Sequence, residues 1–264
     1  MGENLYEEEE EEKVIFYTPF HSLLFLLMII FGVFIFLTMF FWYSSAFITL
    51  FRTLGFRFSE SVLLAFAVIF FSAALSIVNI PVYRVVKEIE VPSIRYIAFF
   101  GIPYTIPTFV RRRRVMIIAV NVGGAVIPIL ISLFLILKIL TFPYCQRVLL
   151  AAATVILLVT IISYVLARPV KGVGIVMPAF IPPLVSAFSS ASIVSSLAIP
   201  IAYAVPVAYI GGTLGVLIGA DILHLIKDWE KLYAPVVSIG GAGTFDGIYL
   251  SGILSIVLLP LFII

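Results

Sequence analysis

The chain has 264 residues, of which 63% are hydrophobic and 11% are charged, and its mean hydropathy is +1.24. A soluble domain is about half apolar and about a quarter charged, so this composition excludes a water-soluble globular protein. The formal net charge of +2 offers no surplus of positive charge for nucleic-acid binding, and the single cysteine, Cys145, excludes an intrachain disulfide bond and a cysteine-based zinc site.

The first 13 residues differ in character from the rest of the chain. Glu7 to Glu12 form an unbroken acidic run, which predicts a disordered cytoplasmic tail at residues 1–13, followed by one transmembrane domain at 14–264. A cleaved signal peptide begins with basic residues, so the first apolar segment is predicted to be a retained anchor. The scarcity of Asn and Gln beside much Ile and Val is typical of a thermophile source.

Apolar segments long enough to cross a bilayer follow one another along the rest of the chain. A membrane-spanning helix needs about 20 apolar residues, and Ser22 to Tyr43 carries no charge at all. We therefore predict an all-α fold, a polytopic bundle of about seven transmembrane helices in the lipid bilayer. The predicted helices are Phe20–Tyr43, Ser61–Tyr83, Val115–Leu140, Val148–Ala167, Gly172–Ser190, Ser195–Ile226 and Phe245–Ile264.

Basic residues between these segments predict the orientation of the bundle. Cytoplasmic connections carry an excess of Lys and Arg, and most of these residues fall in three connections on one side. This predicts a multi-pass protein of the cell membrane with its N-terminus in the cytoplasm and its C-terminus outside. The basic residues on the predicted cytoplasmic side are Arg84, Lys87, Arg95, Arg111 to Arg114, Arg168, Lys171, Lys227 and Lys231, against Arg52, Arg57, Lys138 and Arg147 on the other side.

The connection between the second and third predicted helices contains an unusual segment, residues 91–108. Its three prolines argue against a long helix, and its β-branched and aromatic residues favour extended structure. We predict a short extended hairpin that turns at Phe100-Gly101. Such a segment could act as a flap or as an edge for pairing with a substrate, or it could be a packed loop at the membrane interface.

Two carboxylates lie within apolar segments instead of in the connections. Asp221 is near the predicted cytoplasmic end of the sixth helix, and Asp246 is near the start of the seventh. An acidic side chain at membrane depth costs about 2.5–3.5 kcal/mol, so both are candidate functional residues. The 18 residues after Asp246 correspond to about 27 Å of helix, which places this residue near the cytoplasmic edge of the membrane. Because the two helices are antiparallel neighbours, we expect the two acids to face each other.

The two acids are also expected to differ in protonation. Asp246 begins a helix and Asp221 ends one, and a helix dipole favours negative charge at its start and disfavours it at its end. This predicts an ionised base at Asp246 and a protonated acid at Asp221, a pair that can activate water against a peptide carbonyl. The segment that precedes Asp246 is expected to let a substrate chain approach closely. Its predicted substrate-binding residues are Gly240, Gly241, Gly243 and Thr244.

These features resemble the intramembrane aspartyl proteases, the presenilin and signal-peptide-peptidase families. The resemblance covers residues 211–260 and is carried by Asp221 and by Gly241-Ala242-Gly243, which precedes Asp246. In those families the second aspartate follows Gly-x-Gly directly, whereas Thr244-Phe245 intervenes here. The resemblance implies a hydrolase whose catalytic residues are Asp221 and Asp246 and whose substrates are membrane-spanning peptides.

A second resemblance covers nearly the whole chain. It is to a family of prokaryotic membrane proteins known only as domain of unknown function 1614, and it implies no activity. The motifs that carry it are Asn79-Ile80-Pro81, Phe100-Gly101-Ile102-Pro103-Tyr104, Gly219-Ala220-Asp221 and Gly240-Gly241-Ala242-Gly243-Thr244-Phe245-Asp246-Gly247.

Other interpretations of the same residues stay open. Asp246 could have no role beyond capping the seventh predicted helix, since Asp is a preferred N-cap residue. Asp221 could pair with His224 or Lys227. Prolines and glycines interrupt three predicted helices, as in transporters that bind ions at broken helices. A proton- or cation-coupled carrier that uses the two aspartates, or a non-catalytic scaffold, would therefore also fit. The interruptions are Asn121 to Gly124, Pro128, Pro178, Pro182, Pro183, Pro200, Pro206, Gly211 and Gly212.

Neither a metal site nor a cofactor site is predicted. The only histidine besides His224 is His21, on the first predicted helix, and one histidine does not make a metal site. The serines between Ser186 and Ser196 have no histidine placed to activate them, so they predict packing at helix contacts.

Overall fold

The computed structural model describes residues 22–100, 102–170, 174–228 and 235–263, and the chain divides into two compact units, Met1–Phe41 and Trp42–Ile264. Helix α1 (Ser22–Thr53) begins in the first unit and ends in the second. Its side chains in the first unit are uncharged and almost all exposed, as expected for a helix that contacts lipid. The predicted acidic tail at 1–13 lies outside the described residues.

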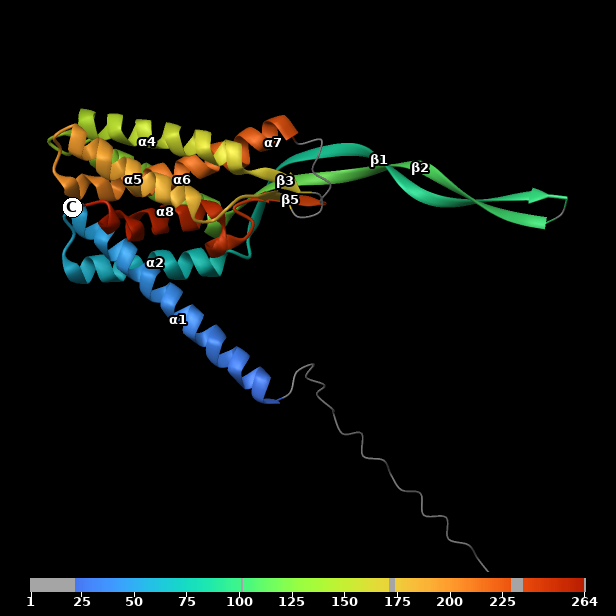
Figure 1. The fold of residues 1–264 in the computed structure, drawn as a ribbon, viewed down its shortest axis with the longest axis horizontal. Helices are drawn as coiled ribbons and strands as arrows, with labels where there is room; N and C mark the ends of the chain where they lie inside the picture. The colour runs from blue at the N-terminus through green and yellow to red at the C-terminus, as the bar shows by residue number, and fades with distance from the viewer. Residues whose placement is uncertain (1–21, 101, 171–173, 229–234, 264) are drawn as a thin grey trace, which may run out of the picture. The chain divides into compact units, whose positions relative to one another are not determined.

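The second unit contains a bundle of helices around α6 (Ala204–Val216). Every residue of α6 except Leu214 is buried, because α4, α5 and α8 lie against it (Figure 1). A helix that is apolar on all sides belongs in such an interior. The other helices are α2 (Phe58–Leu75), α3 (Ile127–Ile139), α4 (Cys145–Leu166), α5 (Ile181–Ser196), α7 (Leu223–Asp228) and α8 (Gly247–Leu258).

Glycines let the helices of this bundle approach one another closely. A Cβ atom on Gly212 would lie 2.6 Å from the carbonyl oxygen of Ser251 on α8, and one on Gly215 would lie 2.5 Å from Cβ of Val159 on α4. Small residues at helix contacts are typical of membrane bundles, where packing replaces the hydrophobic effect as the force between helices.

Within the described residues, five helical stretches are long and apolar enough to cross a membrane, so the chain is a multi-pass membrane protein by this measure. The predicted spans Gly172–Ser190 and Phe245–Ile264 overlap shorter apolar helices, at Ile181–Ser196 and Gly247–Leu261, so the predicted count of seven is not confirmed. The five stretches are Leu23–Thr53, Phe58–Leu75, Val122–Ile139, Cys145–Leu166 and Ile201–Asp228.

A long β-hairpin corrects the predicted all-α fold to a mostly helical one with small sheets. Strand β1 (Asn79–Phe99) pairs antiparallel with β2 (Ile102–Asn121) along its length. At about 3.3 Å per residue, each strand is roughly 65 Å long. Phe99 pairs with Ile102, so the turn lies where the sequence predicts it, but the strands extend far beyond residues 91–108.

Two predicted helices are wrong where they enter this hairpin. Residues 79–83, predicted to end the helix Ser61–Tyr83, belong to β1, and residues 115–121, predicted to begin the helix Val115–Leu140, belong to β2. Both stretches are rich in Val and Ile. These residues are apolar enough for a membrane helix, and their β-branched side chains also favour a strand. Hydropathy alone therefore does not separate the two structures.

Shorter elements complete the second unit. Strand β5 (Val236–Ile239) pairs in parallel with Ile117–Val120 of β2, which gives a sheet with the order β1-β2-β5. Strands β3 (Arg168–Val170) and β4 (Gly174–Val176) form a separate antiparallel pair. Among the described residues, two segments are π-helical, η1 (Val122–Val126) and η3 (Leu217–Ile222). The described 3₁₀ turns are η2 (Ile201–Tyr203), η5 (Gly243–Phe245) and η6 (Leu259–Leu261).

Candidate functional site

Asp221 lies on the π-helical segment η3, within a helical stretch that runs from Ile201 to Asp228. A π-helical segment widens the helix locally and is frequent at functional sites. Gly219 lies against α4, since a Cβ atom there would be 2.3 Å from the carbonyl oxygen of Thr160. Residues two apart project from roughly opposite sides of a helix. The contact at Gly219 therefore leaves Asp221 on the side away from α4.

Asp246 is the N-cap residue of α8. Its Oδ1 accepts a hydrogen bond from the N–H of Ile248 at 3.0 Å, and its Oδ2 accepts one from the N–H of Ala242 at 3.3 Å. The capping interpretation is therefore confirmed. Both backbone donors favour the ionised form of the Asp246 carboxyl.

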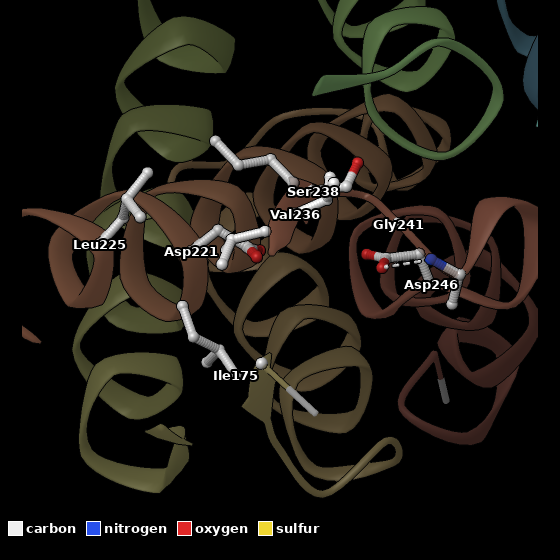
Figure 2. A pocket seen from close by; sticks show the side chains of 11 residues that line it. Ile175, Asp221, Leu225, Val236, Ser238, Gly241 and Asp246 are labelled. Carbon is white, nitrogen blue, oxygen red and sulfur yellow. Dashed lines mark hydrogen bonds between the residues drawn. The ribbon is translucent and has the colours of Figure 1, made fainter. Parts of the chain in front are cut away.

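The carboxyl groups of Asp221 and Asp246 nevertheless share one pocket. Figure 2 shows the two side chains directed toward each other, Asp221 from η3 and Asp246 from the start of α8. The pocket has a volume of about 370 Å³, and its walls come from η3, α7, β4, β5 and the turn before α8. The structure thus brings together the two acids that the sequence singles out, and Asp246 both caps a helix and lines a cavity.

One wall of this pocket is the outer edge of strand β5. All four of its residues, Val236 to Ile239, line the pocket, although the side chains of a strand alternate between its two faces. The pocket therefore lies along the edge of the strand. The other edge of β5 is paired with β2, where the N–H of Ile117 donates to the carbonyl of Pro235 at 2.9 Å. By the alternation of a parallel ladder, the N–H of Val236 is then directed to the pocket side.

The residues predicted to bind substrate before Asp246 have different surroundings. Gly241 lines the pocket. Gly240 and Gly243 have positive φ values of 73° and 64°, and a Cβ atom on either would come within 2.7 Å of residues of η1 or the end of α2. The carbonyl of Thr244 accepts a hydrogen bond from the hydroxyl of Tyr43 at 3.0 Å. Packing thus accounts for Gly240 and Gly243, and a substrate-binding role for them and for Thr244 stays a prediction.

His224 on α7 is buried in a separate set of contacts and is not among the residues that line the pocket. Its Nδ1 lies 3.2 Å from the carbonyl oxygen of Gly219, and its ring contacts Tyr164 at 4.8 Å between centroids. Nζ of Lys227 donates to the hydroxyl of Tyr164 at 2.6 Å. Asp221 takes part in none of these contacts. Over the described residues, no three His, Cys, Asp or Glu side chains are grouped so that they could hold a metal ion.

A polar network around the buried side chain of Asn121 connects the hairpin to the pocket, and sequence reasoning missed it. Asn121 is fully buried; its Nδ2 donates to the carbonyl of Ser76 at 2.7 Å and to Oδ1 of Asn79 at 3.1 Å. Its Oδ1 accepts from the N–H of Gly124 at 2.8 Å. Oδ1 of Asn79 also accepts from the hydroxyl of Ser238 on β5 at 2.6 Å. The chain has only three asparagines, and two of them meet here. The scarcity of asparagine was the one signal in the sequence that could have pointed to this network.

One family shares most of this sequence. Its model, described as a protein of unknown function (DUF1614), matches residues 73–258, which is more than half of the chain. No curated protein and no solved structure matches the chain. The family match confirms the second resemblance drawn from the sequence, whereas the resemblance to the presenilin and signal-peptide-peptidase families has no counterpart among these comparisons.

Proposed function

Since the chain belongs to the DUF1614 family, described as of unknown function, we propose an activity from its own geometry: it is an aspartyl hydrolase that cleaves peptide segments at the membrane. The observation that supports this most is the pair of carboxyls, Asp221 and Asp246, directed into one pocket (Figure 2). Two acids that share a site favour a state in which one proton is held between them. That state supplies a base and an acid together.

In the proposed reaction, Asp246 is the base and Asp221 is the acid. Asp246 removes a proton from a water molecule, whose oxygen forms a bond to the substrate's carbonyl carbon, while Asp221 gives its proton to the carbonyl oxygen. The C–N bond then breaks as Asp246 passes its proton to the leaving nitrogen and Asp221 regains one from the gem-diol. The two backbone N–H groups that donate to Asp246 support its role as the ionised partner.

The outer edge of β5 supports a peptide as the substrate. A peptide bond is exposed to water and acids only where the chain is extended, because a helix shields its backbone. An extended chain can add to an open strand edge through backbone hydrogen bonds, and the edge of β5 lies in the wall of the pocket that both acids face. A peptide paired there would place a carbonyl group beside Asp221 and Asp246.

Asparagine substitutions separate catalysis from helix capping. Asn caps a helix about as well as Asp, so Asp246→Asn keeps the cap and removes the base. We expect Asp221→Asn and Asp246→Asn each to lower the rate of cleavage by about 10²–10⁴-fold. Both variants should keep the thermal stability of the wild-type protein. The measurement uses full-length protein in liposomes with a panel of single-span peptides, and mass spectrometry of the fragments.

Asp228 supplies the matched control. It is a buried acid on the same helical stretch and is not among the residues that line the pocket. Asp228→Asn should leave the rate of cleavage at the wild-type value. If Asp246→Asn still cleaves at that rate, Asp246 only caps α8 and the hydrolase proposal is lost.

A carrier of protons or cations is the second candidate, and two observations favour it. The π-helical segments η1 and η3 interrupt long apolar helices, as broken helices do at ion sites. Beside η3, the buried hydroxyls of Thr160 and Ser163 on α4 find no hydrogen-bond partner within the described part of the chain. Intact peptides together with an ion flux that Asp221→Asn abolishes in liposomes would favour the carrier over the hydrolase.

A further inference from the structure

A second cavity lies beside the pocket of Asp221 and Asp246, which we call the acid pocket. This second cavity has a volume of about 540 Å³, and its walls come from β1, β2, β5, η3 and α7. Among the described residues that line it, all are aliphatic except Tyr83. A concave site of this size and character suits an apolar group of a ligand. We call it the apolar cavity, and its lining includes Tyr83, Ile118, Val120, Leu225, Ile226 and Ile239.

One face of the sheet β1-β2-β5 forms the floor of the apolar cavity. Paired residues of neighbouring strands project from the same face, as do residues two apart along one strand. Tyr83 pairs with Ile118, and Val120 pairs with Ile239. The four side chains therefore project from one face of the sheet, and all four line the cavity.

The roof of the apolar cavity is the end of the helical stretch that carries Asp221. Leu225 of α7 packs against the buried cluster of Met116 and Val237, which belong to the same face of the sheet. Ile222 follows Asp221 directly in η3 and lines the apolar cavity, whereas Asp221 lines the acid pocket. Neighbouring residues of η3 thus belong to a charged site and to an apolar one.

The two cavities adjoin each other. Leu225 and Ile239 line both of them. Leu225 is four residues after Asp221, which is about one helical turn, and Figure 2 shows both side chains in the wall of the acid pocket. A group bound between the two acids therefore has an apolar space close beside it.

A peptide paired with the open edge of β5 would direct one side chain toward that space. Such a peptide would lie about 4.8 Å from β5, so a side chain on the face of Ile239 would lie beside Ile239 and Leu225. Across neighbouring strands, aromatic and long side chains reach diagonal positions about 7–8 Å away. A side chain of the size of Leu, Met or Phe can therefore enter the apolar cavity, whereas the methyl group of Ala is too short.

We propose that the apolar cavity is the subsite that selects the substrate: it accepts one large apolar side chain next to the peptide bond that Asp221 and Asp246 cleave. An aliphatic lining favours such a side chain and excludes a charged one, because burial of an unpaired charge is costly. The substrate class is an extended peptide with Leu, Met or Phe at this position. The subsite rests on the proposed hydrolase activity, but the side chain can bind whether or not the bond is cleaved.

Matched peptides and variants that fill the cavity test the subsite. The peptides are identical single-span sequences that carry Ala, Leu or Phe on either side of the cleaved bond in turn, and the enzyme is full-length protein in liposomes. At one of these positions the wild type should cleave the Leu and Phe peptides with a kcat/KM at least about tenfold above that of the Ala peptide. Val82→Trp and Ile226→Trp fill the cavity from two different walls, at positions that are 65% and 70% exposed. Each variant should abolish the advantage of Leu and Phe and leave the kcat/KM of the Ala peptide unchanged.

Val86→Trp supplies the matched control. Val86 is on the same strand as Val82, it is 64% exposed, and it is not among the residues that line the apolar cavity. This variant should keep the wild-type preference. Equal cleavage of the three peptides by the wild type, an equal loss for the Ala and Phe peptides in the filled variants, or a lost preference in Val86→Trp would each overturn the subsite.

Photocrosslinking tests the subsite without cleavage. Full-length Asp246→Asn protein in liposomes is mixed with a peptide whose varied residue carries a benzophenone, an apolar aromatic group that attaches to nearby C–H bonds under light. Crosslinks at Tyr83, Ile118 or Ile226, located by mass spectrometry, support the subsite. They would do so even if the wild type cleaves no peptide, a result that ends the hydrolase proposal alone. Crosslinks elsewhere on the chain, crosslinks to phospholipid alone, or none at all would overturn the subsite, whatever the rate of cleavage by the wild type.

Discussion

Met116 and Phe109 belong to the same strand, β2, but Met116 is 3% exposed and Phe109 is 70% exposed. Near Met116 the strand is the middle member of a three-stranded sheet, and Val237 of β5 and Leu225 of α7 pack with it. Near Phe109, among the residues that the structure describes, the strand pairs with β1 alone. The environment of a strand is thus decided by segments from elsewhere in the chain, and the base of the hairpin should respond to mutation far more strongly than its distal part.

The largest effect is expected at Gly124, where the hairpin joins the bundle. A Cβ atom there would lie 2.2 Å from the carbonyl oxygen of Gly240, a backbone atom that cannot move without its neighbours. We expect Gly124→Val to lower the free energy of unfolding by about 3 kcal/mol, measured by titration of the folded protein with denaturing detergent. Gly32→Val, with nothing within 4 Å of the added atom, is the control, and an equal loss there would contradict this explanation.

A smaller loss is expected at Asn121, the buried centre of the polar network. Asn121→Leu leaves the N–H of Gly124 and the carbonyl of Ser76 without this partner, and an unpaired buried polar group costs about 1–3 kcal/mol. The same titration measures the loss. Thr105→Leu, at an exposed position near the turn, should be close to neutral; if the two variants are equally stable, the network does not hold the base of the hairpin.

Substitution in β5 tests whether its two edges have different roles. Val236→Pro removes an N–H that the ladder directs to the pocket, so it should leave the fold intact and lower kcat/KM for peptides about threefold to tenfold, the value of one hydrogen bond. Val237→Pro removes an N–H on the side of β2 and should instead destabilise the protein. Peptide cleavage and thermal unfolding of both variants give the comparison, which depends on the proposed hydrolase activity. The reverse outcome would place the open edge elsewhere.

The smallest effect on stability is expected in the distal part of the hairpin. Phe109→Ser should change the free energy of unfolding of a single copy by no more than about 0.5 kcal/mol, as at other exposed positions. Val110→Ser, at the neighbouring exposed position of the same strand, should be equally close to neutral, and the same titration with denaturing detergent measures both variants. A large loss of stability in Phe109→Ser would show that the side chain is covered within one copy.

Much of the helical architecture could be predicted, because long apolar runs have few alternatives to a membrane helix. The predicted helix Val148–Ala167 lies close to α4, Cys145–Leu166. The turn at Phe100 was also predictable, since glycine and proline act locally. The length of the strands was not, because Val and Ile residues fit either structure until a pairing partner is known.

The candidate site was predictable only in its charged members. Asp221 and Asp246 stand out because charge is rare in apolar segments. Strand β5 does not stand out in the sequence, because four residues are too few for a periodic pattern and the strand forms only against β2. The role of the glycines before Asp246 could not be predicted from the sequence either. A glycine indicates that a side chain is excluded, but Gly240 and Gly243 are closed off by the chain itself.

The parallel pairing of β5 with β2 also sets the order in which the molecule matures. Ile117 leaves the ribosome long before its partner Val236, and chain segments fold as they are synthesised. The wall of the acid pocket is therefore missing until β5 has been synthesised and has reached β2. A polypeptide that stops before β5 carries an incomplete site, so any activity of this pocket has to wait for synthesis beyond that strand.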